Sequence, residues 1–367
     1  MRNRNLDAIR AFAILLVLIH HLSALPGPAP GWLRTFWIRG YIGVDLFFVL
    51  SGWLIAGQLF RAIHRDGRLD IGRFWARRWL RTLPAYYAVA VFLVVRAIQS
   101  GNERLPLGVA VFAQNYTAPH AWYITWSLCV EEHFYIALPL VLWVVRGRRW
   151  AAIAAGATFA VASPALRWMA YREMMAGTWT EYLDRFYPLT HLRLDGLVLG
   201  VVAAALKEYD TGVWRWAEKH ARAIALGGFA LLVASAYNPA AYSWDETDRM
   251  AFFAAVPSFF LVSLGVAALL PAAVGPQSAE RRWWSSSATW LAEHAYALYL
   301  VHYIVYGMVG RHLRIPYPAA VAAALLGAAG CAWLLRRLIE VPGLQVRDWY
   351  EDRKRGRAVS LVAARER

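Results

Sequence analysis

Long apolar stretches, most of them close to the length of a membrane-crossing helix, follow one another along almost the whole chain. A helix needs about 20 mostly apolar residues to cross the hydrocarbon core of a bilayer. Seven stretches approach this length: 8–25, 41–60, 122–145, 151–170, 251–270, 291–310 and 319–339. Three more are shorter: 84–99, 191–206 and 222–238. The pattern predicts an all-α fold, a polytopic membrane helix bundle with about ten transmembrane helices.

The composition also indicates a bilayer as the solvent. Of the 367 residues, 59% are hydrophobic and 17% are charged, whereas soluble domains have roughly 45–50% and 25%. The only cysteines, Cys129 and Cys331, lie inside apolar stretches. The sequence therefore offers neither a disulfide framework nor a thiolate metal site, and we expect no metal.

The net charge of +15 is explained by orientation in the membrane. Ten spans place both termini on one side, and 28 of the 39 Lys and Arg residues then fall in the segments on that side. Because cytoplasmic loops are enriched in Lys and Arg, we expect both termini to be cytoplasmic, in the inner or plasma membrane, with no nucleic-acid partner. We divide the chain into a membrane domain, 1–342, and a basic cytoplasmic tail, 343–367, that can touch anionic lipid.

Ionisable residues inside apolar spans are functional candidates because a charge in the membrane is costly. Arg10 and His21 are 11 residues apart in the first stretch, which puts both on one helix face with about 16 Å between their heights. The alternative is that Arg10 anchors the helix at the interface and His21 is a hydrogen-bonded core residue.

A second candidate is the segment Trp126–Tyr135, WSLCVEEHFY, which leads into an apolar run. Glu131 and Glu132 are about 100° apart on a helix, so only one of them can face a given cavity. A buried carboxylate there would orient an imidazole or hold a proton. The alternative is a pair of helix-capping residues at the interface. The segment lacks the His-Glu-x-x-His spacing of a metal site.

A third candidate is the basic segment 73–84, RFWARRWLRTLP, between the second and third stretches. Arg78 and Arg81 are three residues apart and share a helix face, and Arg77 lies beside them. Arginine forks bind phosphate in a bidentate manner, which suits a nucleotide-bearing ligand from the cytosol. The simpler interpretation is topological, because inner loops are basic in any case.

Seven segments, taken together and in this order, resemble the acyltransferase-3 family of integral membrane acyltransferases. The similarity extends over about 6–342, with His133 and Ala297 as departures from frequent family residues. The segments are Leu6–Arg10 with His21, Gly43–Gly52, Arg78 to Arg81 with Pro84, Trp126–Tyr135, Arg193–Leu197, Tyr296–His302 and Glu340–Pro342.

The resemblance implies an acyl-CoA donor from the cytosol, with acetyl-CoA the commonest, and a catalytic histidine at His21. The acceptor would be a hydroxyl group of a cell-surface or exported carbohydrate, or of another molecule. Some family members carry a C-terminal extracytoplasmic esterase-like domain. Because this chain continues into a short basic tail, we expect transfer without a fused partner.

We therefore expect an O-acyltransferase in which His21 is the general base, since the unperturbed pKa of histidine, about 6.5, suits that role. Glu131, or else Glu132, would orient the imidazole, and Arg10 would bind donor phosphate or stabilise the oxyanion. Arg78, Arg81 and Arg77 would hold the nucleotide end of the donor. A mechanism through a covalent acyl-histidine intermediate is an alternative that the sequence does not exclude. The alternative function is a polytopic transporter or flippase of a lipid-linked glycan, which buried charges would also serve.

Overall fold

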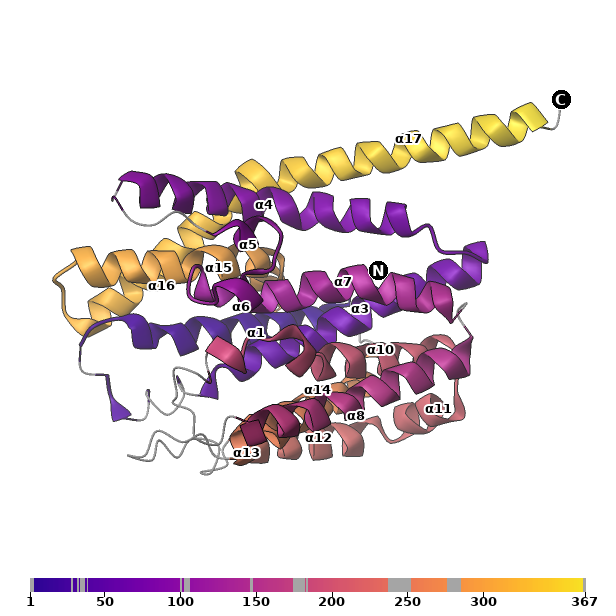
Figure 1. Cartoon of the computed structure of the whole chain (residues 1–367), viewed down its shortest axis with the longest axis horizontal. Helices are drawn as coiled ribbons and strands as arrows, with labels where there is room; N and C mark the ends of the chain where they lie inside the picture. The colour runs from indigo at the N-terminus through magenta and orange to yellow at the C-terminus, as the bar shows by residue number, and fades with distance from the viewer. Residues whose placement is uncertain are drawn as a thin grey trace.

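The computed structural model describes residues 3–27, 29–31, 33, 37, 39–99, 101, 106–145, 148–173, 182, 184–236, 252–275 and 285–365. Every element in these ranges is helical, which confirms the all-α prediction. The longer helices run roughly parallel to one axis of the molecule and form a bundle (Figure 1).

The first half of the chain contains α1 (Arg4–His21), η1 (Leu22–Ala24), α3 (Ile42–Asp66), α4 (Ile71–Gln99), α5 (Leu107–Ala110), α6 (Gln114–Thr117), η2 (Tyr123–Thr125), α7 (Trp126–Val144) and α8 (Arg149–Glu173). The second half contains η3 (Thr190–Leu192), α10 (Asp195–Glu208), α11 (Gly212–Lys219), α12 (Ala221–Ala236), α13 (Phe252–Ala255), α14 (Pro257–Val274), α15 (Ser285–His312), α16 (Tyr317–Leu335), η5 (Arg336–Glu340) and α17 (Val341–Arg365).

Six helical segments within the described residues are long and apolar enough to cross a membrane. They are Arg4–Ala24, Ile42–Asp66, Ile71–Gln99, Tyr123–Val144, Pro257–Val274 and Tyr317–Arg353. The predicted span 191–206 corresponds mainly to α10, whose 14 residues extend about 21 Å, less than the ~30 Å of a bilayer core. The number of ten spans and the cytoplasmic position of both termini stay predictions.

Helix α3 forms the centre of the bundle and packs against α1, α7, α10 and α14. Its close approach to α10 depends on two glycines. A Cβ atom at Gly52 would collide with the Leu197 carbonyl, and one at Gly200 would collide with the Val49 carbonyl. Close packing of the two backbones therefore requires the absence of a side chain at both positions.

The residues predicted as a tail, 343–367, are helical as far as Arg365. The first part of α17 packs against α4, where Gly343 lies against the Leu80 carbonyl. Figure 1 shows α17 running along α4 at one edge of the bundle and then extending past its end. The turn between α3 and α4 lies at this same end, so α17 is positioned beside the basic segment of α4 (Figure 1).

Candidate active site

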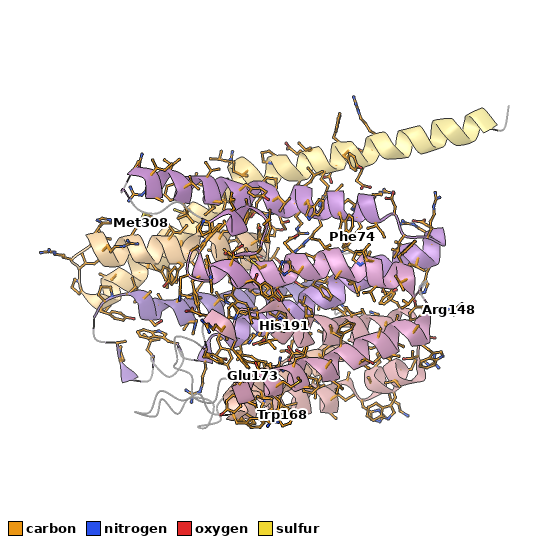
Figure 2. The ribbon with its side chains drawn as sticks, viewed as in Figure 1. Phe74, Arg148, Trp168, Glu173, His191 and Met308 are labelled. Carbon is orange, nitrogen blue, oxygen red and sulfur yellow. The ribbon has the colours of Figure 1, made fainter. Side chains whose placement is uncertain are left out.

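The first part of the candidate site is a large basic cavity, of about 1270 Å³, beside the turn that joins α3 to α4. Phe74, labelled in Figure 2 between α4 and α7, contributes to its apolar wall together with Leu69 and Trp143. The predicted donor-binding residues all line this cavity, among seven arginines: Arg65, Arg68, Arg73, Arg77, Arg78, Arg81 and Arg347. A cavity of this size and charge suits a large polyanion.

The arginines of this cavity are held in part by carboxylates. Glu351 on α17 accepts hydrogen bonds from Arg73, with Nε to Oε2 at 2.9 Å, and lies 3.8 Å from Nε of Arg77. Asp66 and Asp70 also line the wall. Helix α17 therefore contributes Arg347 to the cavity wall and, in Glu351, a carboxylate that contacts two of the lining arginines. Neither residue was assigned a site role from the sequence.

A smaller cavity, of about 120 Å³, lies deeper in the bundle, between α1, α3, α4, α7 and α15. Arg78 and Arg81 line both cavities, so the two spaces meet at these side chains. The side chain of Arg10 is part of the inner wall. The other polar residues of that wall are Ser51, Thr82, Ser127, Glu131, Tyr296 and Tyr299.

At the inner cavity, Glu131 contacts groups other than His21, the partner expected from the sequence. It accepts a hydrogen bond of 2.6 Å from the Ser51 hydroxyl and lies 3.8 Å from Nη2 of Arg78. The guanidinium of Arg78 also lies 4.1 Å from the ring centre of Tyr135. In the described part of the chain, no hydrogen bond or ion pair joins Glu131 to His21, so the expected Glu131–His21 pair is not formed.

The residue that contacts His21 is another histidine. Nε2 of His302, on α15, lies 3.2 Å from Nδ1 of His21, and the same nitrogen of His21 lies 2.9 Å from the Val17 carbonyl oxygen. His302 is fully buried, and its own Nδ1 lies 2.9 Å from the Leu298 carbonyl oxygen. The pair joins α1 to α15 across 281 positions of sequence.

The histidine pair lies next to Tyr299, one of the residues that line the inner cavity. Tyr299 lines that cavity and precedes His302 by three residues, with 5.9 Å between their ring centres. Its hydroxyl donates to the Ile124 carbonyl at 2.6 Å and accepts from the Ser127 hydroxyl at 2.5 Å. The basic cavity, the inner cavity and the histidine pair thus follow one another through the bundle.

A second buried polar cluster is separate from this path. Arg193 and Asp45 form an ion pair of 2.8 Å, and Arg167 and Asp195 form one of 2.7 Å, with all four side chains nearly inaccessible to solvent. The Arg193 guanidinium stacks over Phe259 at 3.7 Å. The two pairs connect α3, α8 and α10 and the loop before α10. These ion pairs give a structural role to Asp45, Arg193 and Asp195, which belong to the segments Gly43–Gly52 and Arg193–Leu197.

The sequence of the chain is similar to that of known proteins. The model of the acyltransferase-3 family, described as an acyltransferase domain, matches residues 3–337. The chain belongs to the acyltransferase-3 family. No solved structure matches it.

Two curated relatives give a more specific comparison. The chain is 27% identical over 365 residues to the O-acetyltransferase OatA of Staphylococcus aureus (strain NCTC 8325 / PS 47), which covers 92% of this chain and 56% of that protein. It is 31% identical over 159 residues to the peptidoglycan O-acetyltransferase OatA of Listeria monocytogenes, covering 38% of this chain and 24% of the relative. The chain therefore spans about half the length of the S. aureus relative.

Proposed function

We propose that this protein is a membrane O-acetyltransferase that moves an acetyl group from acetyl-CoA to a hydroxyl group of a cell-surface or exported carbohydrate. Membership of an acyltransferase family supports the reaction class, and the names of the relatives support acetyl transfer to a glycan. The observation that carries the proposal is that the two cavities share Arg78 and Arg81, and that Tyr299 of the inner cavity lies beside the histidine pair.

The basic cavity suits the phosphates of the donor. Arg81 shares the walls of the two cavities with Arg10, Arg78 and Arg347, and these like charges repel one another. A bound polyanion would remove that repulsion and accept bidentate hydrogen bonds from the guanidinium forks. Phe74 and Trp143 offer apolar surface for the base of the nucleotide. The nucleotide end would therefore stay at the basic cavity.

The pantetheine arm of the donor would enter the inner cavity between Arg78 and Arg81 and extend toward Tyr299. The helical rise from Arg10 to His21 is about 16 Å, a distance that suits an extended arm better than a compact ligand. This places the thioester carbonyl near the histidine pair, while the phosphates remain at the other end of the path.

In the proposed reaction, Nε2 of His21 takes the proton of the acceptor hydroxyl as its oxygen attacks the thioester carbonyl carbon. A carbon–oxygen bond forms, the carbon–sulfur bond breaks, and the sulfur receives the proton that His21 accepted, so that coenzyme A leaves as the thiol. General base catalysis of this kind contributes about 10²–10⁴-fold to the rate. For Glu131 we propose a role on the donor side, which its contacts with Ser51 and Arg78 support.

The test is His21→Ala in cells, with the ester-linked acetyl content of purified surface glycan measured by mass spectrometry. We expect acetylation to be lost at normal membrane levels of the variant. The matched control is His294→Ala, a histidine on α15 that lines neither cavity. Full acetylation in the His21 variant would refute its role. Loss of glycan export without any difference in acetylation would favour a transporter instead.

A further inference from the structure

The tautomer of His302 follows from its hydrogen bonds. Its Nδ1 lies 2.9 Å from the Leu298 carbonyl oxygen, and a carbonyl oxygen only accepts. Nδ1 therefore carries the proton and donates it to Leu298. A neutral imidazole has a single N–H group, which leaves Nε2 of His302 with a free lone pair. That lone pair faces His21 at 3.2 Å.

The tautomer of His21 is fixed in turn. Its Nδ1 lies close to two acceptors, the Val17 carbonyl oxygen at 2.9 Å and Nε2 of His302 at 3.2 Å. The proton of His21 must therefore be on Nδ1, where the two acceptors share it. A charged His302 would instead direct an N–H group at the N–H group of His21. The neutral arrangement leaves Nε2 of His21 unprotonated, which is the state that a general base requires.

We infer that His302 is a positioning residue that, together with the Val17 carbonyl, holds His21 in the Nδ1–H tautomer and fixes the plane of its ring. This inference rests on the proposed function, in which His21 is the base. His302 thereby does what a carboxylate does for the histidine of a catalytic triad, but as a neutral acceptor. Among the described residues, the other titratable groups that face the His21 ring are His20 on α1 and Tyr303 on α15, with ring centres 4.9 and 5.4 Å away.

The kinetic test compares His302→Leu, which has no acceptor, with His302→Gln, whose amide oxygen can accept from His21. The assay follows [¹⁴C]acetyl transfer from acetyl-CoA to a chitin oligosaccharide by purified protein. We expect kcat of the Leu variant to fall at least tenfold, at most by the ~10²–10⁴-fold that a general base contributes, with the KM for acetyl-CoA unchanged. The Gln variant should recover part of the loss.

His294→Ala serves as the matched control. His294 lies on the same helix and bonds the carbonyl four residues earlier, Trp290, at 2.8 Å, but it contacts neither His21 nor an acceptor nitrogen. The kcat of the His294→Ala variant should equal that of the wild type. A fully active His302→Leu variant would overturn the inference. Equal losses in the Leu and Gln variants, with the tautomer of His21 unchanged, would also overturn it and show that His302 only supports packing.

The tautomers can also be read directly in the wild-type protein. Nitrogen-15 chemical shifts distinguish Nδ1–H from Nε2–H imidazoles, and the His21 signal is assigned by its absence in His21→Ala. We expect Nδ1–H in the wild type and a mixture of tautomers in His302→Leu. An Nε2–H signal for His21 in the wild type contradicts the inference even if neither His302 variant folds. If His21→Ala itself is active, the proposed function fails, whatever the result for His302.

Discussion

Arg81→Ala gives the sharpest test of donor binding. Arg81 lines both cavities, and the positive side chains of Arg10, Arg78 and Arg347 act on it. A hydrogen bond to a charged group contributes about 1.5–3 kcal/mol, and tenfold in affinity corresponds to about 1.4 kcal/mol. Loss of one such contact to a donor phosphate should therefore weaken acetyl-CoA binding by roughly 10- to 150-fold.

The assay is isothermal titration of the purified protein with acetyl-CoA in detergent. Arg81→Lys keeps the charge but loses the fork, so its affinity should fall between those of the wild type and the Ala variant. The matched control is Arg96→Ala, because Arg96 is an exposed residue of α4 that lines neither cavity. An unchanged Kd for the Arg81→Ala variant would show that the basic segment only sets topology and would refute the donor path.

Two further variants test neighbouring parts of the structure. Glu351→Gln should tighten acetyl-CoA binding by about 1.4- to 5-fold in the same titration. The reason is that its partly exposed ion pair with Arg73 contributes about 0.2–1 kcal/mol, which a donor phosphate must overcome in order to bind Arg73. Weaker binding would show instead that Glu351 orders the cavity. Asp45→Asn should lower the free energy of unfolding by about 3–5 kcal/mol, because it leaves the Arg193 charge buried without its partner. A thermal midpoint equal to that of the wild type would contradict this reasoning.

Local patterns predicted much of the fold and some of the site. Hydrophobic stretches predicted an all-helical bundle, and the three-residue spacing of Arg78 and Arg81 predicted that both side chains face one space, as they do at the two cavities. Arg10 and His21 both belong to α1, and their position on one face of that helix stays a prediction. These properties depend on the helical repeat, which neighbouring residues determine.

Contacts between distant helices were not predictable in this way. The partner of His21 is set by the packing of α15 against α1, which brings His302 into contact from 281 positions away. The contacts of Glu131 were not predictable for the same reason, because α3 and α4 supply Ser51 and Arg78 as its partners. Arg347 and Glu351 were placed in a solvated tail, since their sequence is polar, yet α17 packs them beside the basic cavity.

The most direct test of the central claim is acetyl transfer across a membrane by the purified protein. Proteoliposomes would hold [¹⁴C]acetyl-CoA on one side and a chitin oligosaccharide on the other, with vesicle integrity checked by retention of the donor. We predict labelled ester on the oligosaccharide with the wild-type protein and none above background with His21→Ala. Equal labelling by the two proteins, or release of the oligosaccharide across the membrane without any label, would contradict the account.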